Sequence, residues 1–544
     1  MNNNWFQTAV FYELYIRAFY DSNGDGHGDF LGAIEKLDYI QSLGVDAVWI
    51  LPHYPSPLKD DGYDVADYLG VHPDYGSLDD FKRFIAAAHQ RGLKVVTDMV
   101  MNHTSDKHPW FQAAVQDTNS PYRDYYVWSD TGKEYADIRL VFPDFEESNW
   151  TWQEQAGQYY WHRFFHHQPD LNFDNPKVHT EMLNAVRFWL DLGVDGFRLD
   201  AVIYLYEREG TDGAGLPETH AFIKKLRALL DNEYPDRVLI AEANDWPVKL
   251  MDYFGESDEC HMCFHFPLMP RLYMAIKQGN KKSLIDILER TPQLPLNTQW
   301  LTFLRNHDEL SLEMVTPEEK EWMMSQYGAD PAAKSNNGIR RRLAPLLENH
   351  KGKWLILNSI LVSLIGTPII YYGDEIGMGE DLSLPDRYSV RTPMQWDRSP
   401  NGGFSGAQET YFPVISDREY GYHAVNVDDQ DEDPESWLNA TRFLLKVRRQ
   451  HPELQRGDMQ IWETTSRAVF AYWRILKEDD RESKTLCLYN LSSEVQSVSL
   501  HFPDLSGRLV DLLHEGKWWT LDDVIPPVLK MRPFASHWLH LIQR

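Results

Sequence analysis

Four short apolar segments of the sequence each end in polar residues that could perform nucleophilic or acid–base chemistry. The segments are DMVMNH, GFRLDAV, LIAEAN and FLRNHD, and their polar residues include His103, Arg198, Asp200, Glu242, His307 and Asp308. A charged side chain beside a packed apolar core costs free energy unless it has a partner, so a single such residue could be a structural ion pair. Four segments that share the pattern favour one common functional site.

Two carboxyl groups about 5 Å apart are what glycoside cleavage with retention of configuration requires. Asp200 is the predicted nucleophile, because Arg198 lies two residues earlier on the same strand face and would keep the carboxylate ionised. Glu242 lies in the apolar run LIAEA, where desolvation would keep it protonated, so it is the predicted general acid and base. Asp308, preceded by His307, is predicted to stabilise the transition state or hold sugar hydroxyls.

The segments belong to a repeating pattern of amphipathic helix, glycine and short apolar strand. One helix is predicted over residues 31–43 before Gly44, the next opens with Ser77 and Asp80 in capping-box spacing, and a third starts at Asn175 with a following proline. Strands that are apolar throughout are buried on both faces, as in a parallel sheet. Eight such strands predict an α/β fold of the (β/α)8 TIM-barrel type. A doubly wound open sheet is the alternative, but no G-x-G-x-x-G follows the first strand.

Several segments stand outside this repeat and predict further parts of the architecture. One segment, rich in Trp, Tyr, His and Asp, is too long for an ordinary loop and predicts an inserted subdomain after the third strand. Insertions after the seventh and eighth strands would rise above the mouth of the barrel as lids. Short strand-like runs such as VFAYWRI and TLCLYNL predict a C-terminal antiparallel β-sandwich. The predicted boundaries are 1–103 and 173–455 for the barrel, 104–172 for the subdomain, about 309–350 and 376–435 for the lids, and 456–544 for the sandwich.

The composition narrows the classes of partner. A formal net charge of −29 argues against a nucleic-acid partner and an anionic membrane surface, and leaves a neutral small molecule as the simplest substrate. The sequence has 3 cysteines, too few for a disulfide framework, and no apolar run of membrane-spanning length. We therefore expect a cytoplasmic protein. The oligomeric state stays open, and a homo-oligomer is compatible with the sequence.

Taken in order, the four segments resemble the motifs of the α-amylase family, glycoside hydrolase family 13, over nearly the whole chain. The resemblance implies that Asp200 is the nucleophile, Glu242 the acid/base and Asp308 the transition-state stabiliser. It also places His103, Arg198 and His307 at sugar-contacting positions.

Two further segments, KDDGYDVADY and VRTPMQWD, resemble the exo-acting α-glucosidases of that family. The resemblance implies that Tyr63 stacks on a glucose ring and that Asp60 binds its far hydroxyls. It further implies that Asp60 pairs with Arg391 and closes the pocket beyond a single glucose. Core packing of Tyr63 and a surface ion pair are the alternatives.

The segments YLYEREGT, DECHMCFHFPLMPR and NHDELSLEMVT resemble the members of the family that isomerise maltose to trehalose. The resemblance implies intramolecular glucosyl transfer on a disaccharide, with some hydrolysis to glucose. Such transfer needs a closed site, for which Phe165, Tyr204 and the segment 309–347 are the candidates. A hydrolytic α-glucosidase or transglucosidase is the alternative. A catalytically silent sugar-binding or partner subunit is disfavoured, since all three carboxylates are present.

Two metal sites are predicted, and no organic cofactor. In DSNGDGHGD the side chains of Asp21, Asn23, Asp25 and Asp29 and the carbonyl of His27 supply oxygen ligands that suit Ca²⁺, with Mg²⁺ as the alternative. The twelfth position is Gly32 rather than Glu, so the loop is not an EF-hand, and a turn held by its own hydrogen bonds is the other interpretation.

The second metal site is implied by the resemblance alone. Its ligands would be Asn102, Asp170 and Glu207, with carbonyl groups at Tyr204 and Leu205. A structural Ca²⁺ there would hold the inserted subdomain on the barrel.

Overall fold

Eight parallel strands close into a barrel in this computed structural model, which describes residues 4–478, 481–521 and 525–543. The order around the barrel is β1-β14-β10-β9-β8-β7-β3-β2. Each barrel strand therefore pairs with the barrel strands that precede and follow it along the chain, and the last, β14, pairs with the first, β1. The (β/α)8 prediction is confirmed. The strands are β1 (Phe11–Leu14), β2 (Ala47–Ile50), β3 (Lys94–Val100), β7 (Gly196–Asp200), β8 (Val238–Ala241), β9 (Met262–Phe264), β10 (Gln299–Phe303) and β14 (Thr367–Tyr371).

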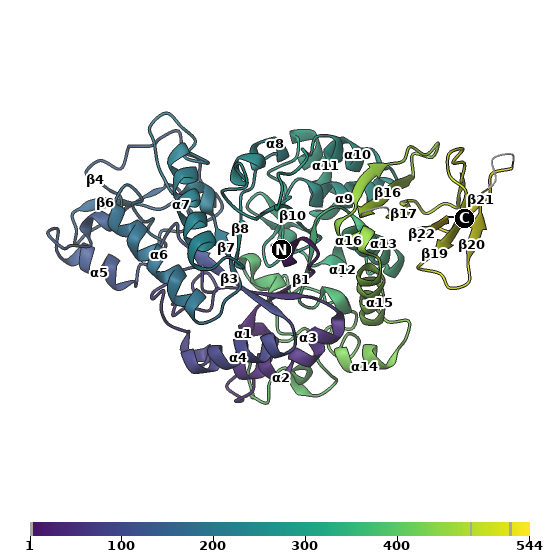
Figure 1. Cartoon of the computed structure of the whole chain (residues 1–544). Coiled ribbons are helices and arrows are strands. Elements are labelled where there is room, and N and C mark those ends of the chain that lie inside the picture. The colour runs from purple at the N-terminus through teal and green to yellow at the C-terminus, as the bar shows by residue number, and fades with distance from the viewer. Residues whose placement is uncertain (1–3, 479–480, 522–524, 544) are drawn as a thin grey trace.

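The helices around the barrel begin largely where the sequence predicts. Ser77 and Asp80 form a complete capping box at the start of α4, and the Asn175 side chain caps α6 ahead of Pro176. These helices, which surround the barrel in Figure 1, are α2 (Phe30–Glu35), α3 (Leu37–Leu43), α4 (Leu78–Gln90), α6 (Pro176–Asp191), α7 (Pro217–Glu233), α9 (Leu268–Gln278), α10 (Lys282–Glu289), α13 (Lys351–Ser363) and α15 (Trp437–Gln450).

The predicted single helix over residues 31–43 is wrong in one respect. It is two helices, α2 and α3, separated at Lys36, whose backbone leaves the helical region. The break lets α2 turn Phe30 and Ala33 into the core, while Leu31, expected on the buried stripe, stays partly exposed. Gly44 ends α3 with a φ of 90°, the left-handed conformation that glycine adopts without strain.

The segment between β3 and β7 folds as a small subdomain. It contains α5 (Pro109–Gln116) and a three-stranded sheet in the order β4-β6-β5, whose strands are β4 (Trp128–Ser129), β6 (Gln158–Trp161) and β5 (Trp150–Gln153). Ile138, Trp150 and Trp161 form a separate apolar cluster inside it. The subdomain lies at one end of the molecule and the C-terminal sheets lie at the other (Figure 1).

The insertions after the seventh and eighth barrel strands carry little regular structure. The first holds a small antiparallel sheet, β11 (Leu310–Ser311), β13 (Gly338–Ile339) and β12 (Lys334–Ser335), together with α11 (Pro317–Tyr327). The second includes the 3-10 helix η8 (Asp386–Val390), which supplies an arginine to the site described below.

The C-terminal region is an antiparallel two-sheet unit. A six-stranded sheet has the order β15-β16-β17-β22-β19-β20, and β18 pairs with β21 beside it. The strands are β15 (Asp458–Ile461), β16 (Val469–Glu478), β17 (Arg481–Asn490), β22 (Ser536–Gln543), β19 (Gly507–Asp511), β20 (Trp518–Thr520), β18 (Gln496–Ser499) and β21 (Val528–Met531).

Alternate residues of one strand in this unit face two different cores. Val469 and Ala471 of β16 pack in the apolar cluster between the two sheets, whereas Phe470 and Tyr472 pack in the main core with the barrel. The period of two along the strand thus lets one sheet face fill the sandwich and the other dock on the barrel.

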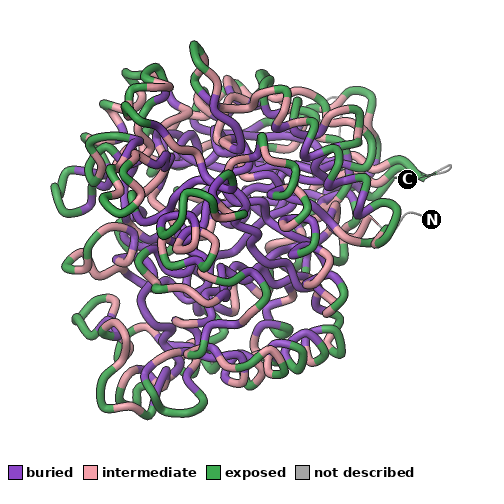
Figure 2. The backbone as a smooth tube through the Cα atoms, turned by 90° about the vertical axis from the view of Figure 1, so that its left-hand side faces the viewer, coloured by how far each residue is buried: buried purple, intermediate pink, exposed green. Residues whose placement is uncertain are grey.

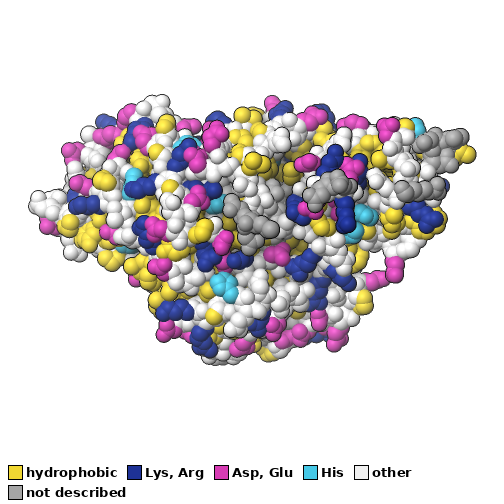
Figure 3. Space-filling model, viewed as in Figure 1, with side chains coloured by type: hydrophobic (Ala, Val, Ile, Leu, Met, Phe, Trp, Pro, Cys, Tyr) yellow, Lys and Arg dark blue, Asp and Glu magenta, His cyan; other side chains and the backbone are white. Residues whose placement is uncertain are grey.

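Burial is concentrated at the centre of the molecule, around the barrel strands (Figure 2). On the face shown in Figure 3, acidic and basic side chains are interspersed. No helix within the described residues is long and apolar enough to cross a membrane. Cys260, Cys263 and Cys487 are buried free thiols, as their number led us to expect.

Candidate active site

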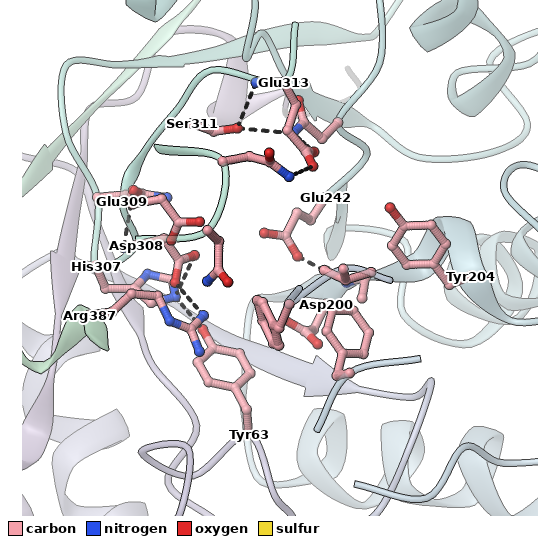
Figure 4. Close-up of a pocket in the computed structure, with 18 of the residues that line it drawn as sticks. Tyr63, Asp200, Tyr204, Glu242, His307, Asp308, Glu309, Ser311, Glu313 and Arg387 are labelled. Carbon is pink, nitrogen blue, oxygen red and sulfur yellow. Dashed lines mark hydrogen bonds and ion pairs between the residues drawn. The ribbon is translucent and has the colours of Figure 1, made fainter. Parts of the chain in front are cut away.

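A pocket opens at the carboxyl ends of the barrel strands, where active sites of this fold lie. Eight of the ten predicted catalytic and substrate-contacting residues line it: Asp60, Tyr63, His103, Arg198, Asp200, Glu242, His307 and Asp308. In Figure 4, His307, Asp308 and Glu309 line one side of the cavity, and Asp200, Glu242 and Tyr204 line the other. The four polar segments of the sequence therefore meet at one site.

Arg198, buried at 2% exposure, is the centre of the charge network. Its Nη1 donates to Asp200 Oδ1 at 2.8 Å and also contacts Asp98, while its Nη2 lies 2.5 Å from Glu242 Oε1. One guanidinium group therefore faces three carboxyl groups. The contact with both Asp200 and Glu242 brings the predicted nucleophile and the predicted acid/base together at one cation.

The protonation of this network differs from the expectation that Arg198 alone keeps Asp200 ionised. Burial raises the pKa of Asp200 well above its usual range, and although Arg198 opposes the rise, the neighbouring carboxyl groups of Glu242 and Asp98 add to it. Burial likewise raises the pKa of Asp98 to about 6. A single cation cannot neutralise three carboxylates, so the cluster as a whole retains a proton. A retaining pair needs one ionised and one protonated carboxyl group.

The backbone after Asp200 helps to aim Glu242. Ala201 has a φ of 47°, a left-handed conformation that a residue with a Cβ rarely adopts. Its N–H donates to Glu242 Oε2 at 2.9 Å. The strained turn at the end of β7 thus holds the side chain that follows β8, and strain of this kind is concentrated at functional sites.

Asp308 is held ionised by cations on its own side of the pocket. Arg387 Nη1 and Arg391 Nη2 both donate to Asp308 Oδ1, at 2.9 and 3.1 Å, and His307 Nε2 lies 3.2 Å from Oδ2. Burial would raise the pKa of Asp308, but His307 and the two arginines outweigh it and hold the pKa well below its usual range. Asp308 therefore presents a negative charge to the cavity.

The predicted pairing of Asp60 with Arg391 is wrong. Asp60 Oδ1 accepts from Arg387 Nη2 at 2.6 Å, whereas Arg391 Nη1 donates to Asp61 Oδ2 at 2.9 Å. Arg391 does not line the pocket, and its Nε bonds the carbonyl of His307 at 2.9 Å. Consecutive aspartates in KDDGYD and two arginines four residues apart allow either pairing, and only the folded backbone decides between them.

Tyr63 and His307 form a stacked pair at the base of the cavity. Their ring planes differ by 9° with centroids 5.5 Å apart, and Tyr63 Oη lies 2.8 Å from His307 Nε2. His307 Nδ1 lies 2.5 Å from Glu13 Oε1, and burial lowers the pKa of His307 and raises that of Glu13. His103, whose pKa burial lowers to about 3, lies 3.1 Å through Nε2 from the carbonyl of Tyr63. His103 is thus placed to act as a neutral hydrogen-bonding group, while His307 lies between the carboxyl groups of Glu13 and Asp308.

Two acidic residues of this network, Glu13 and Asp98, were not predicted. Each is fully buried inside a barrel strand that otherwise reads as apolar, FYEL and KVVTDMV. An isolated carboxylate within such a strand is costly unless partnered. That cost is the signal in the sequence that could have identified them.

Phe165 does not line the pocket, although it is predicted to help close the site around the substrate. Phe142 and Phe164 line the pocket instead, and the ring of Phe165 lies tilted against Phe142 and stacked on His167. Tyr204 does line the cavity, and the guanidinium of Arg163 lies over its ring at 4.2 Å.

The outer wall of the pocket consists of amide and hydroxyl side chains grouped around the carboxylate of Glu313. Glu313 accepts from Asn244 Nδ2 at 2.7 Å and from Asn337 Nδ2 at 3.3 Å, and Ser311 Oγ lies 3.3 Å from the same Asn244 nitrogen. Arg139 of the inserted subdomain pairs with Glu313 at 2.7 Å. This ion pair joins the subdomain to the first lid segment across the mouth of the barrel. None of these residues except those within 309–347 was predicted.

Three of the residues predicted for the second metal site, Asn102, Asp170 and Glu207, lie near one another. Asp170 pairs across a β-bridge with His103, next to Asn102. Burial raises the pKa of Asp170 to about 7, and burial followed by the nearby Asp170 raises that of Glu207 well above its usual range. Asp170 Oδ2 and Asn102 Oδ1 are buried and find no hydrogen-bond partner among the described residues. Unpartnered buried oxygens beside two buried carboxyl groups fit a cation.

The N-terminal loop has a different character. Asp21 accepts from the N–H groups of Asn23, Gly24 and Gly26, and Asp25 accepts from that of His27. Asp29 caps α2 through Gly32. These bonds account for the turn by themselves, which is the alternative weighed from the sequence.

Comparisons with known proteins agree with this geometry. The family model described as the alpha amylase catalytic domain matches residues 13–329 and 335–457. The chain therefore belongs to the α-amylase family. Within that family it is 50% identical to the trehalose synthase of Pimelobacter sp. (strain R48), over 99% of this chain and 96% of that protein.

Two further relatives bear on the site. The chain is 53% identical to the trehalose synthase/amylase TreS of Mycolicibacterium smegmatis, over 93% of this chain and 88% of that protein. An inactive double mutant of MutB in complex with isomaltulose superposes with a TM-score of 0.80 at 27% identity, covering 99% of each chain.

Proposed function

We propose that this enzyme interconverts maltose and trehalose by intramolecular transfer of an α-glucosyl group. The observation that carries the proposal is the contact of Asp200 and Glu242 with one arginine at the carboxyl ends of neighbouring strands, opposite an ionised Asp308. Likeness over nearly the full chain to trehalose synthases supports the choice of substrates.

The first half of the reaction forms a covalent glucosyl-enzyme. An Asp200 oxygen bonds to the anomeric carbon of the non-reducing glucose, the bond from that carbon to O4 of the second glucose breaks, and Glu242 gives its proton to O4. Asp308, held ionised by Arg387 and Arg391, faces the positive charge that develops on the ring.

The second half returns the glucosyl group to the other sugar. The released glucose turns so that its anomeric hydroxyl faces the intermediate, gives its proton to Glu242 and bonds to the anomeric carbon, while the bond to Asp200 breaks. Attack by water at the same carbon would give two glucose molecules. The outcome therefore depends on keeping the first glucose in and water out.

The outer wall suits retention of the released glucose. The amides of Asn244 and Asn337 and the hydroxyl of Ser311 can exchange hydrogen bonds with sugar hydroxyls in more than one orientation. Glu313, paired with Arg139, and Tyr204 line the cavity, and we assign them the role of excluding water.

Product analysis tests the proposal. Purified protein incubated with maltose is expected to form trehalose as the main product, with a smaller amount of glucose, and trehalose supplied alone is expected to give maltose. Glucose as the sole product from maltose would refute isomerisation and identify a hydrolytic α-glucosidase.

We also propose a structural Ca²⁺ held by Asn102, Asp170, Glu207 and the carbonyl groups of Tyr204 and Leu205. Two buried carboxyl groups with unpartnered oxygens nearby support it, because oxygen ligands and negative charge are what this ion prefers. When bound, the ion would neutralise Asp170 and Glu207 and link the subdomain to the barrel. The N-terminal loop, with Asp21, Asn23, Asp25, His27 and Asp29, remains a second and weaker proposal for Ca²⁺ or Mg²⁺.

Removal of metal tests this pair of sites. After dialysis against EDTA, added Ca²⁺ is expected to raise Tm, and this gain should be lost in Asp170→Asn and retained in Asp25→Asn. Loss of the response to Ca²⁺ in Asp25→Asn but not in Asp170→Asn would place the ion in the N-terminal loop. A Tm that does not respond to EDTA or Ca²⁺ in any of the proteins would remove both proposals.

The location and partners remain predictions. The net charge of −29 and the three free cysteines support a cytoplasmic protein that does not bind nucleic acid or membranes. A homo-oligomer remains open.

A further inference from the structure

A second cluster of metal-ligating side chains lies far from the pocket, where the barrel meets the C-terminal sheet. His451 lies between α15 and α16 (Pro452–Arg456), Glu453 lies in the first turn of α16, and His540 lies on β22. The helix α16 packs against β16 and β17, and His540 is paired with Thr485 across β17 and β22. The three side chains therefore join the last helices of the barrel to the last strand of the chain.

The three side chains converge on one carboxylate oxygen. Glu453 Oε1 lies 3.1 Å from His451 Nδ1 and 3.0 Å from His540 Nδ1, and it accepts from Thr485 Oγ1 at 2.6 Å. One oxygen of a buried carboxylate therefore already faces both imidazole nitrogens.

The arrangement is close to that of a tetrahedral metal site. With metal–ligand bonds of 2.0–2.2 Å, neighbouring ligands of Zn²⁺ lie roughly 3.3 Å apart. The present separations of 3.0 and 3.1 Å differ from that by a few tenths of an ångström, and the ligand atoms of all three residues lie within 4.8 Å of one another. Small rotations of the two rings would therefore admit an ion.

The donor set and the access favour a transition metal over Ca²⁺ or Mg²⁺. Two imidazole nitrogens and one carboxylate oxygen suit Zn²⁺ and its neighbours, whereas the hard cations require six or more oxygens. The side chains of His451 and His540 are 20% and 25% exposed, while that of Glu453 is 1% exposed. An ion could reach the cluster from solvent and keep a water molecule in its fourth position.

We propose that His451, Glu453 and His540 bind one Zn²⁺-class ion that fastens the C-terminal sheet to the barrel. The ion would replace bonds that now depend on a single carboxylate oxygen, and it would stabilise the junction between the two parts of the chain. This site is independent of the proposed transfer reaction.

A second trio, Asp511, His514 and His537, also combines two histidines with one carboxylate and provides an internal comparison. Its nitrogens lie 2.9 and 2.6 Å from Asp511 Oδ2, and Asp511 Oδ1 accepts from the N–H of Leu513. Hydrogen bonds hold both clusters, and those to Asp511 Oδ2 are the shorter. The trio also lies within the C-terminal unit alone, and we expect it to remain a hydrogen-bonded cluster.

Zinc titration of the full chain tests the proposal. After dialysis against EDTA, the native protein is expected to bind one zinc ion per chain tightly, measured by competition with a chromophoric chelator, and to gain Tm on addition of zinc. His540→Gln is expected to lose both effects. His514→Gln in the comparison trio and His501→Gln at an exposed position are the matched controls, and both are expected to retain them.

Three results would overturn the proposal. They are the absence of tight zinc binding by the native protein, equal binding by His540→Gln, and loss of binding in His514→Gln instead. Should His540→Gln fail to fold, X-ray absorption of the zinc-loaded native protein still decides. Two imidazole ligands with oxygen would support the site, and ligation by oxygen alone would contradict it.

Discussion

The two sides of the pocket differ in how they are built and in what they can do. The inner side consists of side chains at the ends of barrel strands, and it is dense in charge: Arg198 faces Asp98, Asp200 and Glu242. The outer side consists of residues from the insertions together with Asn244, which follows β8, and its amides and hydroxyl surround the carboxylate of Glu313.

This difference separates bond breaking from the choice of acceptor. Preorganised charges on rigid strands stabilise a developing charge without moving, which suits cleavage of a glycosidic bond. Hydroxyl- and amide-lined surfaces on inserted loops hold a sugar without fixing one orientation, which suits the turn that isomerisation needs. We therefore expect substitutions on the inner side to abolish reaction and those on the outer side to redirect it.

The largest expected effect is at the inner side. Asp200→Asn and Glu242→Gln should each lower turnover of maltose by about four orders of magnitude or more, because each removes a group that bonds or transfers a proton to the reacting atoms. Circular dichroism and Tm should remain close to those of the native protein.

Asp195→Asn, at the opposite end of the same strand, is the matched control. Asp195 is buried, and it accepts from His89 at 2.7 Å and from Lys94 at 3.0 Å, so its loss should cost about 1–3 kcal/mol of unfolding free energy. Turnover by the folded fraction should stay within a few-fold of native. Near-native turnover in Asp200→Asn or Glu242→Gln would contradict the assignment of roles.

The next effect tests the corrected ion pair at the closed end of the pocket. Arg387→Gln should lower kcat/KM by about 100-fold, because Arg387 positions both Asp60 and Asp308. A double-mutant cycle should show coupling of about 1–3 kcal/mol between Asp60→Asn and Arg387→Gln, and less between Asp60→Asn and Arg391→Gln. Stronger coupling of Asp60 with Arg391 would restore the pairing expected from the sequence.

The inner side could be predicted from the sequence and the outer side largely could not, for a physical reason. A carboxylate or arginine at the end of an apolar strand stands out, since its burial must be compensated, and Arg198, Asp200 and Glu242 were found in this way. Asn244 and Asn337 lie in loops, where polar residues are ordinary. The pairing of Asp60 failed for a related reason, because the side of the chain that a loop residue faces depends on tertiary contacts.

A smaller effect is expected at the outer side, in the products rather than in the rate. Glu313→Gln removes the charge that holds Arg139 across the mouth of the pocket. If it loosens this contact by about 1 kcal/mol, the ratio of glucose to trehalose should rise about fivefold, with total consumption of maltose changed far less. Chromatography of the products over time measures the ratio.

Lys133→Gln, an exposed change in the same subdomain, is the control for that experiment and should leave the ratio unaltered. An unchanged ratio in Glu313→Gln would show that the ion pair does not exclude water. A loss of all activity would place Glu313 with the inner, bond-breaking residues and break the division between the two sides.

The smallest expected effect concerns Glu309, where the two sides meet. Burial raises its pKa to about 7, Arg387 opposes the rise and Asp308 adds to it. Because the folded-state pKa lies above that of the unfolded chain, the stabilisation that goes with the bound proton is fully present below the unfolded pKa and is lost as pH rises through about 7.

Glu309→Gln carries no such proton and should escape this loss. Relative to native protein it should therefore gain unfolding free energy between pH 5 and pH 8, by at most about 3 kcal/mol, the limit that a shift of 2–2.5 pKa units allows. Denaturant unfolding at the two pH values measures the gain, with the exposed Glu321→Gln as the control. An equal difference between native protein and Glu309→Gln at both pH values would mean that Glu309 is ionised throughout, and the charged inner side would then extend one residue further toward the lid.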